Sequence, residues 1–279
     1  MVCSFLRQVH RVALRGGGPL LAAMLGLLLA LPAAPAAAKP VTLTYLAYLM
    51  GIPVLSMTAN ADLPMTAGAQ MADGAYALNA NIVTQGQLST LYPYRMTLAS
   101  HGRMTGSRVL PGQFHSEGQI MQQTESVTLT YGSGGRVTIE AVPLTRQAQE
   151  AAAQGTANGT IDPASLVMAV VAAYAEKQNC AGNYKLFDGV RRYDLVIQQV
   201  GNGNVQFYKQ SFYQGPAVEC QAAPTLMQGF APMAVESKLY PQSANIWLAP
   251  AVQGMPAVPV RIETQNALGS MVFDLVAAQ

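Results

Sequence analysis

The sequence is poor in the residue types that most enzyme sites and nucleic-acid interfaces need. Charged residues make up 11% of the chain, and it has only three histidines and three cysteines. One histidine and one cysteine fall within the first 38 residues, so two of each remain after them. Beyond the pair Arg191 and Arg192 there is no cluster of basic residues. This scarcity excludes the electrostatic footprint of a nucleic-acid-binding protein.

The apolar run near the N-terminus, from Pro19 to Leu31, has about 13 residues, short of the roughly 20 that a membrane-spanning helix needs. It follows three arginines, Arg7, Arg11 and Arg15, and precedes small residues, which is the order of a secretory signal. We therefore expect a signal peptide over residues 1–38, cleaved between Ala38 and Lys39. The remainder is expected to be exported without a membrane anchor, to the periplasm in a Gram-negative bacterium.

The positive charge of the whole chain belongs to this predicted signal. Removing residues 1–38 takes away three of the 16 basic residues and none of the 14 acidic ones, which leaves a charge near −1. A hydrophobic content of 51% is ample for a core. We expect one large β domain over residues 39–279.

Cys180 and Cys220 are the two cysteines that remain after the predicted cleavage. An even number in an exported chain favours a disulfide between them, and the alternative is two buried free thiols. A metal site is not expected, because no histidine or further cysteine lies near them in sequence to complete a ligand set. The sequence implies no cofactor.

Alternating apolar and polar residues separated by turn signals predict an antiparallel sheet of roughly a dozen strands. Residues 41–49 and 52–60 form an expected hairpin with Gly51 at its turn. Pro53 suits either the beginning of a strand or an edge strand, because proline cannot donate to a strand ladder, and we expect this hairpin to border the sheet. The other strands are expected at 75–84, 94–100, 113–121, 124–131, 136–142, on both sides of Gly201–Asn204, and at 245–249, 257–264 and 269–276.

One helix is predicted, over residues 162–177. Asp162 can accept hydrogen bonds from the first free N–H groups, and Pro163 suits the first helical position. The helix is apolar nearly all round, so it must be covered on more than one side. Residues 143–161, with an alanine and glutamine run and two glycines, are expected to be a small polar connector.

The segment between the two cysteines predicts a hairpin. If Asn202 and Gly203 are the central residues of a type I′ turn, Ile197 pairs with Tyr208 and Tyr193 pairs with Phe212. The face that carries Ile197 is then the better candidate for the core.

A series of short motifs resembles the DUF3108 proteins, exported bacterial proteins of unassigned function. The motifs span residues 41–276 in order: 45–53 (YLAYLMGIP), 73–76 (DGAY), His101-Gly102, 111–114 (PGQF), 161–165 (IDPAS), 187–195 (FDGVRRYDL), Cys220, 246–248 (IWL) and 259–262 (PVRI). The resemblance implies an envelope protein. More loosely, it implies a fold similar to the open half-barrels of the periplasmic lipoprotein carriers, in which a large curved antiparallel sheet is packed on a central apolar helix. It supplies no catalytic residues.

No catalytic constellation is visible. His101 and His115 lack a third metal ligand, a nucleophile and an orienting carboxylate, and we interpret them as surface or turn residues. Asp188 lies close to Arg191, Arg192 and Asp194, which we interpret as turn and salt-bridge residues rather than as a catalytic carboxylate pair.

Three functions stay open. The first is a noncatalytic binding or carrier-like module for a lipid, an acyl chain or an apolar partner segment, lined by one helical stripe of Val167, Val170, Val171 and Tyr174. In that reading the alternative is a helix that simply fills the sheet. The second is a structural or assembly protein of the cell envelope, and the third is a hydrolase with a site dispersed in the sequence.

Overall fold

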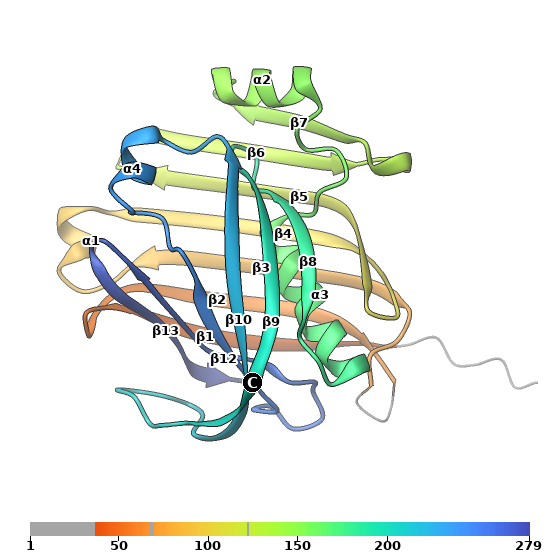
Figure 1. The fold of residues 1–279 in the computed structure, drawn as a ribbon, viewed down its shortest axis with the longest axis vertical. Helices are drawn as coiled ribbons and strands as arrows, with labels where there is room; N and C mark the ends of the chain where they lie inside the picture. The colour runs from red at the N-terminus through yellow and green to blue at the C-terminus, as the bar shows by residue number, and fades with distance from the viewer. Residues whose placement is uncertain (1–36, 67–69, 122) are drawn as a thin grey trace, which may run out of the picture. The chain divides into compact units, whose positions relative to one another are not determined.

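The computed structural model describes residues 37–66, 70–121 and 123–279. Within these ranges, thirteen strands form one antiparallel sheet in the order β7-β6-β5-β4-β3-β2-β1-β13-β12-β11-β10-β9-β8 (Figure 1). The strands are β1 (Ala37–Leu49), β2 (Ile52–Met65), β3 (Gly74–Thr84), β4 (Tyr94–Thr105), β5 (Arg108–Ile120), β6 (Gln123–Tyr131), β7 (Val137–Val142), β8 (Gly182–Phe187), β9 (Arg192–Val205), β10 (Gly215–Gln228), β11 (Ala244–Ala249), β12 (Val258–Asn266) and β13 (Gly269–Ala278).

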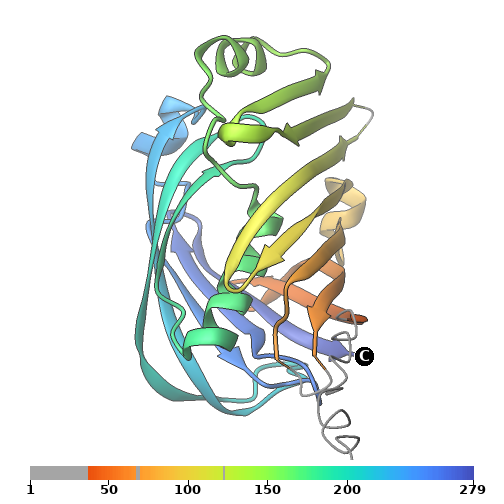
Figure 2. The same ribbon diagram turned by 90° about the vertical axis from the view of Figure 1, so that its right-hand side faces the viewer.

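The predicted mainly β fold is confirmed. The sheet does not close on itself, and Figure 2 shows it curving around the long helix α3 (Pro163–Lys177). The other helices are short: α1 (Leu88–Leu91), α2 (Arg146–Gln154), α4 (Pro232–Glu236) and a 3-10 turn at Ser133–Gly135. The predicted signal peptide lies outside the described residues except for Ala37 and Ala38, which begin β1. The single-domain boundary at residue 39 therefore stays a prediction.

The hairpin β1–β2 has the predicted turn but not the predicted position. Met50 and Gly51 both have positive φ, as a two-residue turn between twisted strands requires. Its strands lie in the middle of the sheet, however, between β3 and β13. Pro53 is tolerated there because the register shifts beside it, between Ala47 and Tyr48, so its missing donor falls at an irregularity of the ladder.

The hairpin β9–β10 contradicts the predicted register. Asn202 and Gly203 are paired with Val218 and Ala217 inside the sheet, and the strands are joined by residues 206–214. Gly203 does not form a turn; it allows the ring of Trp247 to pack closely against the strand, because a Cβ at this position would lie 2.9 Å from Cζ3 of Trp247. The predicted pairs of Ile197 with Tyr208 and of Tyr193 with Phe212 are therefore wrong.

The true partners are Ala222 for Ile197 and Leu226 for Tyr193. Ile197 is nevertheless buried, as expected. The loop 206–214 is held by Arg261, whose Nη2 donates to the carbonyl oxygen of Gln206 (3.0 Å) and to Oγ of Ser211 (3.1 Å). A buried arginine from a distant strand, which no local pattern reveals, thus organises this connection.

The helix α3 begins as predicted, with Asp162 at its N-cap and Pro163 at its first position. It fills part of the concave side of the sheet. Met168, Ala169 and Ala172 belong to the larger hydrophobic cluster, whereas Val170 packs in a second cluster with Ile197 and Leu248. The near-uniform apolarity of the helix is explained by this burial on two sides.

Residues 143–161 contain a helix, α2, where a polar connector was predicted. The side chain of Thr145 caps it by accepting a hydrogen bond from the N–H of Ala148 (3.2 Å), and Gly155 ends it with φ of 62°. The signals were present, but the alanine and glutamine run between them resembled a polar linker.

The end of this connector bridges the two edge strands of the sheet. On the β7 side, the N–H of Gly159 donates to the carbonyl oxygen of Gly135 (2.7 Å) and the N–H of Val137 to Oδ1 of Asn158 (2.9 Å). On the β8 side, the N–H of Ile161 donates to the carbonyl oxygen of Lys185 (2.9 Å). Both sheet edges are therefore partly satisfied by one irregular segment.

The predicted disulfide is confirmed. Cys180 and Cys220 are bonded, with their Cα atoms 6.4 Å apart, and both are buried. Cys180 lies between α3 and β8, and Cys220 lies in β10. The bond ties the exit of the helix to the sheet that covers it.

Candidate functional site

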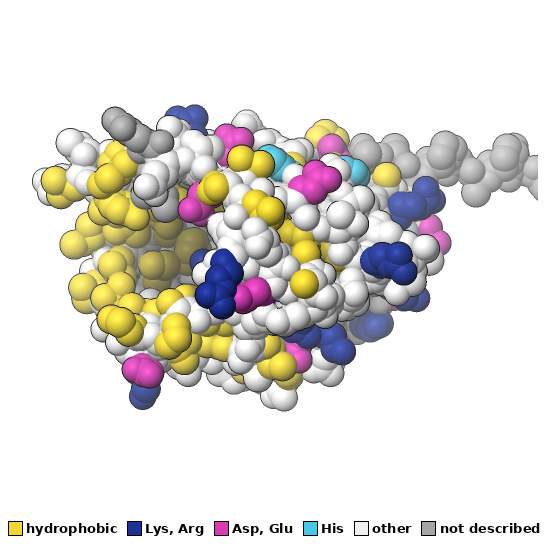
Figure 3. All heavy atoms as spheres, turned by 90° about the horizontal axis from the view of Figure 1, so that it is seen from above, with side chains coloured by type: hydrophobic (Ala, Val, Ile, Leu, Met, Phe, Trp, Pro, Cys, Tyr) yellow, Lys and Arg dark blue, Asp and Glu magenta, His cyan; other side chains and the backbone are white. Residues whose placement is uncertain are grey.

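The concave side of the sheet is not filled along its whole length. A cavity of about 400 Å³, which we call the sheet pocket, lies between strands β4–β6 and the loop that joins β8 to β9. Viewed from above in Figure 3, one side of the molecule is hollowed, and the walls of the hollow are mostly hydrophobic. A hollow of this size is within the range of small-ligand sites.

The wall of the sheet pocket follows from the strand register. Met96 of β4 pairs with Gly118 of β5, and Leu98 pairs with Ser116. These four residues share one face because side chains alternate along a strand. The central strand thus presents small residues where its neighbours present large ones, and a Cβ added at Gly118 would meet no atom within 4 Å. The pocket exists because β5 leaves that space empty.

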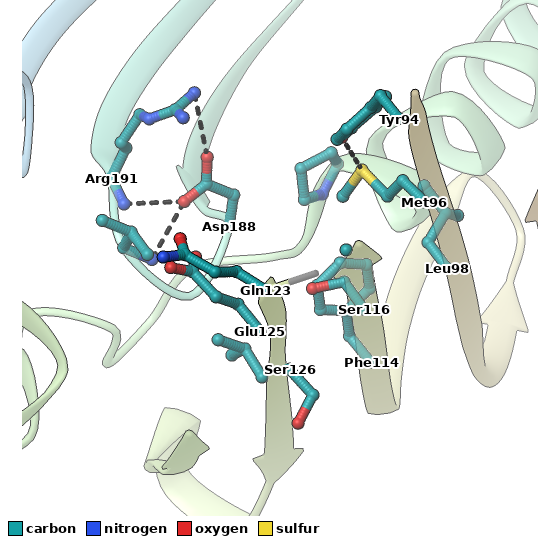
Figure 4. Close-up of a pocket in the computed structure, with 14 residues that line it drawn as sticks. Tyr94, Met96, Leu98, Phe114, Ser116, Gln123, Glu125, Ser126, Asp188 and Arg191 are labelled. Atoms are coloured by element: carbon teal, nitrogen blue, oxygen red, sulfur yellow. Dashed lines mark hydrogen bonds and ion pairs between the residues drawn. The ribbon is translucent and has the colours of Figure 1, made fainter. Parts of the chain in front are cut away.

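The pocket becomes more polar toward its mouth. Tyr94, Gln123 and Glu125 line it together with Asp188 and Arg191, while Phe114 forms part of its buried wall (Figure 4). The hydroxyl of Tyr94 donates to Sδ of Met96 (3.1 Å). The arrangement is therefore amphiphilic, with an apolar floor and a polar rim.

The loop opposite β4–β6 is a turn organised by Asp188. Its Oδ1 accepts hydrogen bonds from the N–H groups of Val190 (3.0 Å) and Arg191 (2.6 Å), and its Oδ2 lies 3.7 Å from Nη1 of Arg191. Gly189 packs against β6, since a Cβ there would lie 2.4 Å from Cγ1 of Val127. The turn and salt-bridge interpretation of this segment agrees with these contacts, and Arg192 forms a separate pair with Asp194 (2.6 Å).

A second cavity of about 310 Å³, the aromatic pocket, lies on the other side of the same loop and shares Asp188 and Arg191 with the first. Its aromatic residues pack edge to face: ring centroids are 6.2 Å apart for Tyr193 and Phe230, and 4.9 Å for Phe230 and Tyr240. The guanidinium of Arg191 lies 5.8 Å from the ring centroid of Tyr240. Burial raises the pKa of Tyr193 to about 12, so its hydroxyl is neutral at physiological pH.

Beside the sheet pocket, at the start of α3, lies a cluster of hydroxyl groups around the fully buried Asp162; of its members only Tyr131 is partly exposed. Its Oδ1 accepts from the N–H of Ser165 (2.8 Å), and its Oδ2 accepts from Oγ of Ser165 (2.5 Å), Oγ of Ser100 (3.2 Å) and the hydroxyl of Tyr131 (3.4 Å). The hydroxyl of Tyr76 lies 2.7 Å from Oγ of Ser165. We call these five residues the Asp162 cluster.

Burial raises the pKa of the Asp162 carboxyl, although the donors from Ser165 and Ser100 oppose that rise. Burial and the nearby carboxylate raise the pKa of the Tyr131 hydroxyl. Every carboxylate oxygen is engaged and Asp162 is 0% exposed. The arrangement caps α3 and holds it to β3, β4 and β6.

The histidines do not join this cluster. His101 and His115 lie on β4 and β5 with parity opposite to Ser100 and Phe114, so they face the other side of the sheet. His101 is exposed, and Nδ1 of His115 lies 3.0 Å from Oγ1 of Thr128. Within the described part of the chain, no group of three potential ligands among His, Cys, Asp and Glu could hold a metal ion.

The predicted lining stripe on α3 is divided between different environments. Val170 and Val171 are buried, Tyr174 is half-buried and Val167 is 39% exposed. The two pockets described above take their walls from other residues, with Pro163 as the contribution of α3. A ligand-lining role for the stripe stays a prediction. Sequence reasoning missed Met96, Leu98 and Gly118, for which the only local signal is a glycine inside a strand.

Among the residues that the structure describes, none of the helices has the length and hydropathy needed to cross a bilayer.

Comparison with known proteins gives a family and a fold. The family model described as "Protein of unknown function (DUF3108)" matches residues 44–276. A search of curated proteins finds no match. A crystal structure described as a β-barrel-like protein of the domain of unknown function DUF1849, from Brucella abortus, superposes with a TM-score of 0.50 at 11% identity. That match covers 88% of this chain and 98% of the other, and it shows the fold alone.

Proposed function

This chain belongs to the DUF3108 family, whose function is unknown, and from that premise we propose that it is a noncatalytic binding protein that holds the apolar chain of an amphiphile in the sheet pocket. One observation carries the proposal: an apolar wall with open space at Gly118 lies beneath a polar rim. A buried core normally fills such space, since protein interiors are close-packed.

The chemistry of the pocket favours binding over catalysis. The apolar part of its wall is formed by Met96, Leu98 and Phe114, which offer dispersion contacts. Ser116 and Ser126 also line the pocket, but no histidine is among its lining residues to act as their base. Methionine suits a site that accepts flexible chains, because its unbranched thioether adapts to their shape. The charged side chains of Glu125, Asp188 and Arg191 lie at the mouth, where the head of an amphiphile would remain in contact with water.

We place this function outside the cytoplasm. The basic, apolar and small-residue order of residues 1–38 supports export, and so does the Cys180–Cys220 disulfide, since such bonds persist in oxidising compartments. In a Gram-negative bacterium the location would be the periplasm. An apolar chain carried through an aqueous compartment needs to be shielded from water, which a pocket with a polar rim provides.

The test is calorimetric titration of the detergent-free protein with a single-chain lysophospholipid below its critical micelle concentration. The wild type is expected to bind, and Gly118→Leu is expected to weaken binding by more than about tenfold, because the new side chain occupies the space of the ligand. The same variant should fold normally, since its Cβ meets no atom within 4 Å.

Gly201→Leu is the matched control. Gly201 is also a strand glycine whose added Cβ would meet no atom within 4 Å, but it lies in β9 and lines neither pocket. This control should bind like the wild type. Absence of binding by the wild type, or equal binding by Gly118→Leu, would reject the sheet pocket as a binding site.

A further inference from the structure

The two pockets meet at two charged residues. Asp188 and Arg191 line both, and the pockets extend from them in different directions: toward β4–β6 in the sheet pocket and toward β9–β11 in the aromatic pocket. Pro224 and Ile246 make the aromatic pocket apolar on its strand side. A ligand that occupied both would therefore have to pass Arg191.

The guanidinium of Arg191 has N–H donors that are not used in hydrogen bonds within the described residues. Its side chain is 47% exposed, its contact with Asp188 is long at 3.7 Å, and its contact with Tyr240 is with the face of the ring. Among residues 37–66, 70–121 and 123–279, no hydrogen bond engages this guanidinium. Arginine presents five N–H donors in a planar fork that matches a carboxylate or a phosphate.

We propose that the two pockets are the branches of one site for an anionic amphiphile with two apolar chains, and that Arg191 binds its phosphate or carboxylate group where the chains diverge. This inference rests on the proposed function and names its ligand class. A single long chain is the poorer fit, because its methylene groups would have to lie against the charged side chains of Asp188 and Arg191 at the junction. A polar group at that point, with one chain in each pocket, places every part of the ligand against a matching surface.

Asp188 also contributes to the proposed anion site at the junction of the two pockets. Because its Oδ1 is held by two backbone N–H groups, its carboxylate stays in place beside Arg191 and limits the positions of the guanidinium. It also offsets part of the positive charge, as does the nearby Glu125 at the rim of the sheet pocket. Recognition of the anion therefore depends on directed hydrogen bonds more than on net charge.

The experiment compares four probes by calorimetry with the full-length protein in detergent-free buffer: short-chain phosphatidylglycerol, the phosphatidylcholine with the same chains, the single-chain lysophosphatidylglycerol, and free glycerol phosphate. Phosphatidylglycerol should bind about tenfold more tightly than its single-chain counterpart, through burial of the second chain. Glycerol phosphate should not bind measurably. Binding of glycerol phosphate as tight as that of the lipid would identify a site for a polar metabolite and overturn the proposal.

Arg191→Gln should weaken phosphatidylglycerol binding by about tenfold, because hydrogen bonds to a charged group are lost. Arg192→Gln is the matched control, since Arg192 is the neighbouring arginine, is paired with Asp194 and lines neither pocket. It should bind like the wild type. Equal effects of the two substitutions would remove the special role of Arg191.

Ser243→Trp adds bulk in the aromatic pocket, and it should abolish the advantage of two chains over one. The two proposals can fail separately. If neither lipid binds, the proposed function fails. If the single-chain lipid binds and the two-chain lipid binds no more tightly, the pocket function stands and the two-branch site is wrong.

Discussion

Two charged side chains on the concave side of the sheet, Asp162 and Arg191, have opposite surroundings. Asp162 is fully buried and accepts four hydrogen bonds within a packed interior. Arg191 is half exposed and adjoins two empty volumes. The carboxylate of Asp162 makes all its hydrogen bonds within the protein, so a structural role explains it fully. Arg191, by contrast, has hydrogen-bond donors that are unused within the described part of the chain, and it lies beside apolar space that a ligand could occupy.

The interior on the concave side of the sheet likewise has a closely packed part and an open part. Where α3 is tied down by the disulfide and by the Asp162 cluster, Val170, Ile197 and Leu248 fill the space between helix and sheet. Where β5 carries Gly118 and Ser116, the space remains open. The packed part keeps the sheet and helix in the arrangement that forms the open part. Substitutions in the packed part should therefore change stability, and substitutions in the open part should change binding.

The largest effect is expected for removal of the disulfide. Replacing both Cys180 and Cys220 with serine should lower the free energy of unfolding by about 4 kcal/mol in the chain-entropy model, given their separation of 40 residues. Urea unfolding of the variant and the wild type, each with and without reductant, measures it. The control is internal, since reductant should destabilise only the wild type. An unchanged midpoint in all four samples would show that the bond does not hold the helix to the sheet.

Asp162→Ala should be next in size, with a loss of about 3 kcal/mol, because the helix loses its cap and buried hydroxyl groups lose their acceptor. Asp62→Ala is the matched control, an exposed aspartate on β2 whose removal should change stability by less than about 0.5 kcal/mol. Chemical unfolding compares the two. Similar losses in both variants would contradict the structural role of the Asp162 cluster.

A smaller effect is expected on the pH dependence of stability, to which the buried Asp162 should contribute and an exposed aspartate should not. Burial raises the pKa of Asp162 in the folded protein above its ordinary value of 3.8, so the folded state binds the proton more tightly than the unfolded state does. This contribution to stability is fully present below 3.8 and is lost as the pH rises through the folded pKa.

Asp162→Asn should abolish that part of the pH dependence, which unfolding experiments across this range can measure. The matched variant Asp62→Asn, at the exposed position, should keep the profile of the wild type. If Asp162→Asn and the wild type lost stability in parallel as the pH rose, another group would be responsible.

The local features of the fold could be predicted, and the features that depend on distant contacts could not. Asp162 and Pro163 correctly predicted the start of α3, and Gly51 correctly predicted the first turn. Both succeeded because capping and turn geometry are set by neighbouring residues. Gly203 was misleading for the opposite reason. It has the composition of a turn, but it serves to accommodate Trp247, which arrives from a strand more than forty residues later.

The candidate site follows the same rule. Its turn at Asp188 was readable, since an Asp-Gly pair is a local signal. The empty space over Gly118 was not, because it depends on what three strands and the loop at Asp188 place around that glycine. The predicted stripe on α3 identified an element facing the interior, while the hollow lies beside the start of that helix.

The central claim is that an apolar chain binds inside the sheet pocket, and photolabelling with a light-activated fatty acid tests it most directly. Peptide mapping by mass spectrometry should place saturable label on the peptides that contain Met96, Leu98 and Phe114, and Gly118→Leu should suppress it. Label confined to exposed apolar side chains outside the pocket, such as Val142 and Leu144, would contradict the account. So would label at the pocket that Gly118→Leu left unchanged.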